Sequence, residues 1–512
     1  MTEDSPTTDD SPSGEELRTA AASGLRWSAI SRPLIEVVQF GGIVVLARLI
    51  APDEFGRFAI ASIAAEVALL LVAGGLTSAL VQRKTLDREH AQTGMAIALI
   101  AGLALTALTL LAASLVVDPI FGARTALFVR LLAPLCLIEA LAAMPVAGLR
   151  RRMDFRRLSE IEILNNVVRV VGCIVLALIG LSGEALVLGM VAGSVASLLL
   201  AWISAPPPLP RLQRAAARDL LSYAAPMSLA TISWVGFFNV DYAIVGARLG
   251  PLQTGYYYRA YTLAVEYQSK LAVVMNQVGF PVLARTSNAA ELAQLYRQMI
   301  RLLTIVLFPA LVLLTIAAPV IVPFVFGARW EPAVVPVQIL ALGGASTIIF
   351  NAVKTVWMST GRVGVLLGFG WGQFIVYGIS VYLVAPLGIV AVAIDAAVVH
   401  ALFAILAYGL MLHGSGEPPM RRLWSDVAPA IVSCLGLVAV ALPASIALTA
   451  ARIPTIPWLV ALGIAALAPY LLTLRVCFPE TWRAQCMVLE RILPGHRRLN
   501  GMRRRLAMAA AH

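Results

Sequence analysis

Six basic residues lie inside stretches of this sequence that are otherwise apolar, where charged side chains are rare and usually serve a function. They are Arg32, Arg130, Arg169, Arg259, Lys270 and Lys354. Arg130 and Lys354 lie near the ends of their stretches, so we expect their long side chains to reach a polar boundary. The other four lie deeper, and we predict that they line a polar, net-cationic cavity.

Polar residues accompany these four cations at spacings that place them on shared helical faces. The three sets are Arg32, Glu36 and Gln39; Glu162, Asn165, Asn166 and Arg169; and Arg259, Glu266 and Lys270. In a cavity, Gln39 and Asn165 would join the four cations in binding a substrate. The alternative is that ion pairs fix helix packing, because Glu36 follows Arg32, and Lys270 follows Glu266, by four residues. The sequence leaves both interpretations open.

The stretches that hold these residues have the length and composition of membrane-spanning helices. Of 512 residues, 60% are hydrophobic and 13% are charged, and apolar runs of about 20 residues recur along the chain. The runs are continuous rather than alternating, which favours helices over a β-barrel. We therefore expect an all-α polytopic membrane protein. Its fourteen predicted spans are 28–49, 58–80, 94–117, 125–148, 159–180, 184–204, 220–247, 255–282, 299–322, 334–357, 365–385, 388–411, 427–449 and 456–475.

Basic residues between the spans predict the orientation of the chain, because cytoplasmic loops collect arginine and lysine. With both termini in the cytoplasm, most of the basic residues fall on the cytoplasmic side. The opposite loops and span ends hold only Arg48, Arg57, Arg124, Arg248, Arg329 and Arg452. The net charge of +11 is thus explained by orientation and by lipid headgroups, and no nucleic-acid partner is expected.

Two halves of the chain share short sequence matches. Ala47-Arg48-Leu49 returns as Ala247-Arg248-Leu249, Gly56 as Gly255, and Phe121-Gly-Ala-Arg124 as Phe326-Gly-Ala-Arg329. A repeat of about 200 residues with an even number of spans predicts two parallel six-helix repeats, as in many transporters, plus two C-terminal helices. The predicted parts are a disordered cytoplasmic tail (1–23), an N-lobe (24–204), a cytoplasmic linker (205–219), a C-lobe (220–413), the last two spans (414–476) and a basic cytoplasmic tail (477–512).

In a transporter, acidic residues within the spans are candidates for binding a coupling ion or proton. These candidates are Glu36, Glu66, Glu139, Glu162, Asp241, Glu266 and Asp395. Tyr256, Tyr257 and Tyr258 fall where an aromatic belt at the membrane interface is expected.

Several functions are not supported by the residues present. The sequence has no Walker A motif, no G-x-S-x-G elbow and no His/Cys metal cluster. Its five cysteines form no C-x-x-C pair and are expected to be buried small residues. No loop between predicted spans is long enough for a catalytic domain. We therefore expect neither an enzyme nor a resident cofactor or metal.

Three stretches resemble a known family. They are LARLIAPDEFGRFAIA from Leu46 with GLTSALVQRKTLDREH from Gly75, and FNVDYAIVGARLGPLQTGYYYRAYTLA from Phe238. They are similar to polysaccharide exporters of the MOP (multidrug/oligosaccharidyl-lipid/polysaccharide) superfamily, and above all to Wzx-type oligosaccharide flippases. The resemblance covers residues 24 to 360, and the later spans agree with it in number and length. The extended N-terminus and the long basic C-terminus depart from the common pattern.

The resemblance implies a MATE-like fold that works by alternating access in the bacterial inner (plasma) membrane. It implies a polyprenyl-diphosphate-linked oligosaccharide as substrate, turned from the inner to the outer leaflet for exopolysaccharide, capsule, O-antigen or cell-wall glycan. Membrane lipids and other polysaccharide assembly proteins are the implied partners. Moving a negative headgroup outward is favoured by about 2.3 kcal/mol per charge per 100 mV, so transport without a coupled ion is feasible.

Three other functions are weaker alternatives. A MATE-type multidrug antiporter exports organic cations and should have an acidic or aromatic site, whereas the deep faces here hold four cations and three carboxylates. A flippase for a lipid-linked peptidoglycan precursor is a closer neighbour. A membrane-bound polymerase or ligase should carry a large external loop with catalytic residues, which is not predicted here.

Overall fold

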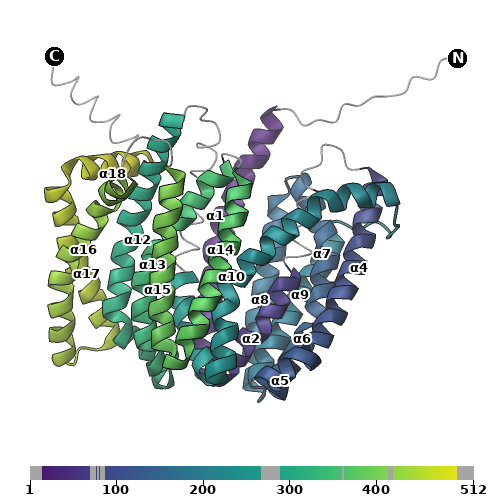
Figure 1. Cartoon of the computed structure of the whole chain (residues 1–512), viewed down its shortest axis with the longest axis horizontal. Helices are drawn as coiled ribbons and strands as arrows, with labels where there is room; N and C mark the ends of the chain where they lie inside the picture. Colours follow the sequence, from purple (N-terminus) through teal and green to yellow (C-terminus); the bar gives the residue numbers. More distant parts are fainter. Residues whose placement is uncertain are drawn as a thin grey trace, which may run out of the picture. The chain divides into compact units, whose positions relative to one another are not determined.

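The structure, a computed structural model, describes residues 14–69, 77, 80, 87–266, 289–359, 362–412 and 419–492. Within these residues the chain forms helices and no strand (Figure 1). The all-α prediction is therefore confirmed for the part of the chain that is described. The helices are α1 (Gly14–Leu49), α2 (Pro52–Leu69), α4 (Arg88–Ala112), α5 (Asp118–Phe121), α6 (Ala123–Leu132), α7 (Pro134–Arg151), α8 (Phe155–Leu178), α9 (Gly183–Ser204), α10 (Arg214–Tyr261), α12 (Ala289–Phe326), α13 (Val334–Ser359), α14 (Val363–Val384), α15 (Ile389–Met411), α16 (Pro419–Ala450), α17 (Thr455–Cys477) and α18 (Pro479–Ile492).

Four short elements extend or join these helices. The π-helical turns Ala113–Val117 and Thr262–Glu266 continue α4 and α10, and the 3-10 turns Ala328–Ala333 and Ala385–Leu387 precede α13 and α15. The predicted span at 125–148 is divided at Ala133 into α6 and α7, because Pro134 has no N–H to continue the ladder.

Ten described helical segments are long and apolar enough to cross a membrane. They coincide with the predicted spans that begin at residues 94, 125, 159, 184, 299, 334, 365, 388, 427 and 456. The other four predicted spans, 28–49, 58–80, 220–247 and 255–282, are helical wherever they are described. Parts of 58–80 and 255–282 lie outside the described residues, and 28–49 carries the charged residues Arg32, Glu36 and Arg48. The count of fourteen stays a prediction.

The described chain divides into two compact units. The first unit comprises residues 1–258, 325–330 and 369–389, and the second comprises residues 259–324, 331–368 and 390–512. The first unit thus includes most of α10 and the greater part of α14 along with helices α1 to α9. The lobe boundaries were predicted from the sequence repeat and not from contacts in space, and they stay a prediction.

The observed helix boundaries differ from the predicted boundaries of the two tails and the linker. Helix α1 begins at Gly14 and so includes residues 14–23, which were predicted to be disordered. Residues 206–213 are not helical, and α10 begins at Arg214, inside the predicted linker. This segment lies against α4, because the Arg211 N–H donates to the Gln92 carbonyl (3.2 Å) and Thr93 bonds both Arg211 and Gln213. In the predicted C-terminal tail, residues 479–492 form α18.

Small residues let α8 approach both of its neighbours in the first unit. On α9, a Cβ at Gly189 would lie 2.3 Å from the Cys173 sulfur, and one at Gly193 would lie 2.7 Å from the Asn165 carbonyl oxygen. On α1, a Cβ at Gly42 would lie 2.5 Å from a Val170 methyl. Closely packed small residues are a common means of joining helices in membranes. They fix the rotation of α8 and hence the direction of its polar face.

The second unit is held together by a buried carboxylate. Asp426 of α16 is fully buried and accepts from the Arg297 Nε of α12 (3.1 Å) and from the Tyr408 hydroxyl of α15 (2.9 Å). Helix α17 packs against α16 and ties to α12 through the Tyr470 hydroxyl, which donates to the Ile305 carbonyl at 2.7 Å. The two helices predicted to follow the repeat are thus attached to α12.

Candidate functional site

Two of the predicted polar faces, on α1 and α8, meet in the first unit. Asn166 of α8 is buried and joins them, since its Oδ1 accepts from the Gln39 Nε2 of α1 (2.5 Å) and from Arg169 (3.0 Å). Nearer the start of α8, Arg32 lies 3.5 Å from the Glu162 carboxylate. We call this set of residues, Arg32, Gln39, Glu162, Asn166 and Arg169, the polar seam.

The charges of the polar seam are accessible rather than sealed in the core. The Arg32 and Glu162 side chains are 57% and 41% exposed. Arg169 is half-buried, and within the described residues it has no carboxylate within ion-pair distance. It lies about 14 Å along the axis from the end of α8 and about 21 Å from the start, so it is far from both helix ends. A cation at that depth without a carboxylate partner is costly unless it contacts water or an anionic ligand.

The polar seam faces away from the apolar surface of both helices. At about 100° per residue, Glu162, Asn166 and Arg169 share one side of α8. The exposed apolar residues Val167, Val171, Val175 and Leu178 lie on the opposite side. The same holds for α1, whose exposed Leu34 and Val37 lie opposite Arg32 and Gln39. The apolar sides suit lipid, and the lining of an internal cavity by the polar seam stays a prediction.

Asn165 has a different role from its neighbour Asn166. Its side-chain amide donates to the Ser197 hydroxyl of α9 (3.2 Å), next to the close approach at Gly193. Asn166, which was not among the predicted site residues, occupies the centre of the polar seam instead. Because Asn165 and Asn166 are adjacent on one helix, the sequence did not indicate which of the two would face α1.

Two predicted coupling residues bond neutral polar side chains of neighbouring helices. Glu66 of α2 accepts from the Asn239 amide of α10 at 2.9 Å, and Glu139 of α7 accepts from the Ser194 hydroxyl of α9 at 2.7 Å. Both carboxylates are half-buried. Neither is neutralised by a basic residue within ion-pair distance in the described chain, so either carboxylate can hold a proton or a cation.

Asp241 is the most enclosed of the predicted acidic residues in the first unit. Its carboxylate is buried and accepts from the hydroxyls of Tyr257 (2.9 Å) and Tyr377 (3.0 Å) and from the Tyr242 N–H (2.9 Å). The prediction that Tyr257 belongs to an interfacial aromatic belt is wrong. Its ring is fully buried, because its hydroxyl is needed to satisfy the Asp241 carboxylate.

The remaining predicted site residues lie in both units or outside the described residues. Arg259 is buried, and Glu266 and Asp395 are half-buried. Glu36, on α1 in the first unit, is half-buried beside the polar seam. Lys270 lies outside the described residues. Within those residues no cluster of three or more His, Cys, Asp or Glu side chains is arranged to hold a metal ion. Cys136, Cys173 and Cys434 are buried as predicted, whereas Cys477 is exposed.

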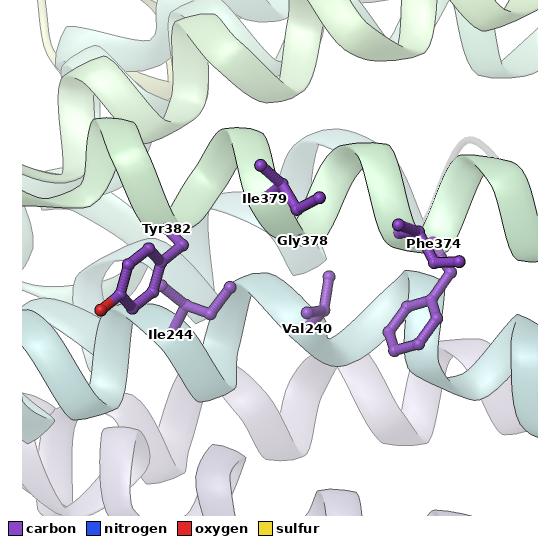
Figure 2. Close-up of a pocket in the computed structure, with 7 residues that line it drawn as sticks. Val240, Ile244, Phe374, Gly378, Ile379 and Tyr382 are labelled. Carbon is purple, nitrogen blue, oxygen red and sulfur yellow. The ribbon is translucent and has the colours of Figure 1, made fainter.

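An apolar groove lies between α10 and α14 in the first unit (Figure 2). Its side chains include Val240, Ile244, Phe374, Ile379 and Tyr382. It contains no charged residue among those that line it.

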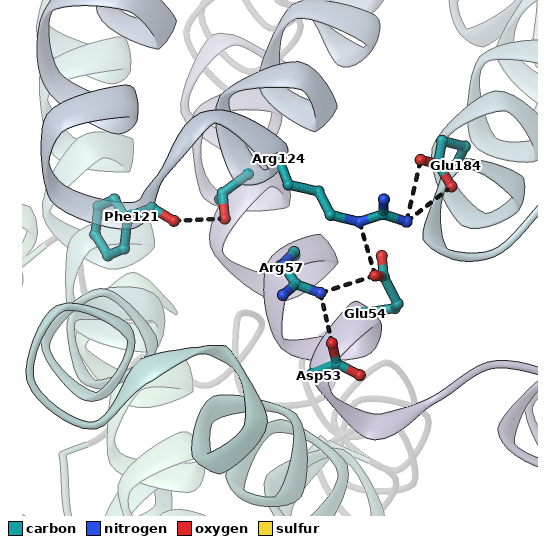
Figure 3. Close-up of polar contacts among 7 residues, drawn as sticks. Asp53, Glu54, Arg57, Phe121, Arg124 and Glu184 are labelled. Atoms are coloured by element: carbon teal, nitrogen blue, oxygen red, sulfur yellow. Dashed lines mark hydrogen bonds and ion pairs between the residues drawn. The ribbon is translucent and has the colours of Figure 1, made fainter.

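An ionic cluster joins the ends of α2, α6 and α9 (Figure 3). Glu54 is nearly buried and lies 2.8 Å from both Arg57 and Arg124, and Arg124 also reaches Glu184 at 3.2 Å. The second copy of the Phe-Gly-Ala-Arg motif contacts the turn before α2. Arg329 and the Trp330 indole donate to the Ala47 carbonyl at 3.0 and 2.9 Å. Both motif glycines, Gly122 and Gly327, have positive φ angles of 85° and 100°.

Gly56 and Gly255 form a reciprocal backbone contact. A Cβ at Gly56 would lie 1.8 Å from the Pro251 carbonyl oxygen, and one at Gly255 would lie 1.9 Å from the Pro52 carbonyl oxygen. Each copy of the repeated stretch thus places its glycine on the other copy's proline. Pro52 begins α2, and Pro251 begins the second part of α10, after a kink at Gly250 (φ 81°). Only glycine allows the two helix starts to approach this closely. The sequence signal was a Pro-x-x-x-Gly pattern present in both copies.

A family model described as polysaccharide biosynthesis protein matches residues 45–335, more than half of the chain. The chain belongs to the polysaccharide biosynthesis protein family. The lipopolysaccharide biosynthesis protein WzxC of Escherichia coli (strain K12) is 23% identical, over 77% of this chain and 82% of its own length. The succinoglycan biosynthesis transport protein ExoT of Rhizobium meliloti (strain 1021) is 27% identical, over 80% of this chain and 83% of its own length.

Among solved structures, the fold is similar to that of the lipid II flippase MurJ in an inward closed conformation. The TM-score is 0.73 at 13% sequence identity, and the match covers 88% of this chain and 98% of the other. At this identity the similarity concerns the fold alone. The predicted resemblance to MOP-type polysaccharide exporters is confirmed by the family and by the fold.

Proposed function

We propose that this protein turns a polyprenyl-diphosphate-linked oligosaccharide from the inner to the outer leaflet of the bacterial inner membrane. The family supports a role in polysaccharide export, and the names of the relatives WzxC and ExoT refer to polysaccharide biosynthesis and transport. The observation that carries the proposal at the level of residues is the polar seam. Its cation Arg169 lies far from both ends of α8 and has no carboxylate within ion-pair distance among the described residues.

The chemistry of the polar seam suits this substrate. A guanidinium binds two phosphate oxygens at once, so Arg169 is matched to a diphosphate. Arg32 lies at an exposed ion pair, and exposed pairs contribute little stability, so it can exchange Glu162 for a phosphate at low cost. The amides of Gln39 and Asn166 can donate to and accept from sugar hydroxyls. Arg259 and Lys270 are further predicted contributors from the C-lobe.

The arrangement of the whole chain that fits this function has fourteen spans, two parallel six-helix repeats and both termini in the cytoplasm. Repetition of local geometry supports the duplication, since Gly122 and Gly327 adopt the same left-handed conformation within the same motif. In alternating access, the contact between Gly56 and Gly255 would close one side of the transporter. On the proposed topology that side is the outer one, because both glycines follow outward-facing turns.

The test combines genetics with reconstitution. In the host, deletion of the gene should abolish one surface glycan and trap its lipid-linked intermediate on the cytoplasmic leaflet. In proteoliposomes, the purified protein should turn over that intermediate, and Arg169→Ala should reduce the rate while leaving the protein inserted. Arg156→Ala is the matched control, because Arg156 is exposed at the start of the same helix and pairs with Glu160.

Other outcomes would separate the alternatives. Unchanged glycans with new sensitivity to cationic drugs would indicate a MATE-type antiporter. A defect confined to peptidoglycan precursors would indicate the other flippase function. Normal turnover by Arg169→Ala in proteoliposomes would contradict the assignment of the polar seam but leave the family role intact.

A further inference from the structure

The groove between α10 and α14 is an open, shallow groove along a helix pair. It has a volume of about 390 Å³. Phe374 and Tyr382 of α14 point towards α10 at its two ends (Figure 2), and the distance along the helix between them is about 12 Å. Between them, Ile379 is exposed, so the groove is open along its length.

Glycines set the depth of this groove. A Cβ at Gly378 would lie 3.3 Å from a Val240 methyl, and one at Gly236 would lie 2.8 Å from the Phe374 ring. The helices therefore approach closely at the floor of the groove, and a larger side chain at Gly378 would fill it.

A cation lies at one end of the groove. The Arg248 guanidinium carbon is 3.9 Å from the centroid of the Tyr382 ring, a cation–π contact that fixes its position. Arg248 is exposed and makes no hydrogen bond or ion pair within the described residues. Its repeat counterpart Arg48 instead donates to the Val325 carbonyl. The donors of Arg248 are thus available to a ligand, and a guanidinium favours phosphate oxygens.

An uncharged groove that ends at an available guanidinium matches an amphiphile with one apolar chain and an anionic head. We propose that the groove binds the first isoprene units of the polyprenyl chain at the outer leaflet, with Arg248 pairing to the diphosphate of the transported product. This inference rests on the proposed function, which places the Arg248 end of α10 at the outer face.

The test is photocrosslinking of the full-length protein in vesicles of phosphatidylethanolamine and phosphatidylglycerol. The probe is polyprenyl diphosphate with a diazirine in its first isoprene units. The expected result is labelling of the peptide that holds Phe374 to Tyr382, competed by unlabelled polyprenyl diphosphate but not by added phosphatidylglycerol. Equal competition by phosphatidylglycerol, or equal labelling of the exposed apolar face of α4 around Leu108, would overturn the proposal.

Variants separate the groove from general effects on folding. Arg248→Gln should weaken binding of the probe about tenfold, the loss expected for one charge-assisted contact. Gly378→Leu should block labelling by filling the groove. The same substitution at Gly372 of the same helix meets open space and should leave labelling unchanged. Unchanged labelling in both groove variants would refute the inference even if each folds normally.

The same preparations distinguish failure of this inference from failure of the proposed function. If the wild-type protein turns over lipid-linked oligosaccharide but the probe labels no preferred peptide, only the groove assignment falls. If the probe labels α14 specifically but no turnover occurs, the site stands and the transport proposal falls.

Discussion

Replacing Gly56 with alanine should prevent the reciprocal contact with the second copy of the repeated stretch. The new Cβ would lie 1.8 Å from the Pro251 carbonyl oxygen and 2.7 Å from its carbon. Close C···O contacts in proteins are about 3.3 Å or longer, so the two backbones must separate by about 1.5 Å. Both partners are backbone atoms at helix starts, which cannot move aside as a flexible side chain would.

The expected magnitude follows from the cost of overpacking. Forcing one extra carbon into a close-packed contact costs about 1–3 kcal/mol. If this contact closes one side of an alternating-access cycle, the closed state loses about 5- to 150-fold in population. Transport should fall with it. Gly255→Ala should act similarly, and the double variant should fall short of additivity because both changes open the same contact.

The accessibility of residue 254 to a reagent in water measures the opening of the contact between Gly56 and Gly255 directly. Thr254 is fully buried beside the contact, and its hydroxyl donates to the Gly250 carbonyl at 2.9 Å. In a background whose five native cysteines are replaced by alanine, a Thr254→Cys protein should resist a membrane-impermeant thiol reagent, and addition of Gly56→Ala should make the cysteine reactive. Gly41→Ala, which meets no atom within 4 Å, is the control. Wild-type transport with an unreactive cysteine in the Gly56→Ala background would refute the reasoning.

Two further predictions concern stability. Glu54→Gln should lower the free energy of unfolding by about 3 kcal/mol, because it removes the nearly buried carboxylate that Arg57 and Arg124 share. Glu160→Gln, at an exposed pair, should change it by less than about 1 kcal/mol. Thermal unfolding in detergent compares the two. Asp426→Asn should destabilise the second unit by a similar 3 kcal/mol or so, since Arg297 and Tyr408 both depend on this carboxylate; protease protection of α16 would report the loss.

The sequence was sufficient to predict that the polar faces of α1 and α8 belong together. Each face repeats at helical spacing with apolar residues opposite, so the expected arrangement was one that brings the two polar faces together. It was not sufficient to predict the partners within the polar seam. The i,i+4 spacing suggested Glu36 for Arg32, whereas the structure brings Glu162 of α8 within 3.5 Å, because helix packing at Gly42 sets the neighbours.

Contacts between distant parts of the chain determine the side-chain positions that local sequence patterns predicted wrongly. A run of three tyrosines near a predicted membrane boundary is typical of an aromatic belt, yet Tyr257 is buried on Asp241. Nothing in the local sequence relates Tyr257 to Tyr377, the other hydroxyl on that carboxylate. The glycine contact, in contrast, had a signal in the repeated Pro-x-x-x-Gly pattern, but its meaning depends on the two copies meeting in space.

The two copies of the proposed repeat carry different chemistry at corresponding positions. Asn166 and Phe374 lie the same number of residues before Gly180 and Gly388, which share a φ of about 100°. Gln39 and its counterpart Asn239 likewise precede the repeated Ala-Arg-Leu by the same distance. In the first copy Gln39 and Asn166 bond each other across α1 and α8.

In the second copy this bond has no equivalent. Asn239 donates to Glu66, and Phe374 packs where Gly236 leaves room for its ring. One helix pair therefore presents amides and cations, while its counterpart presents an apolar groove that ends at Arg248. A substrate with a diphosphate, sugars and a long apolar chain needs both kinds of surface. Duplication followed by divergence of one helix pair would supply them on a single scaffold.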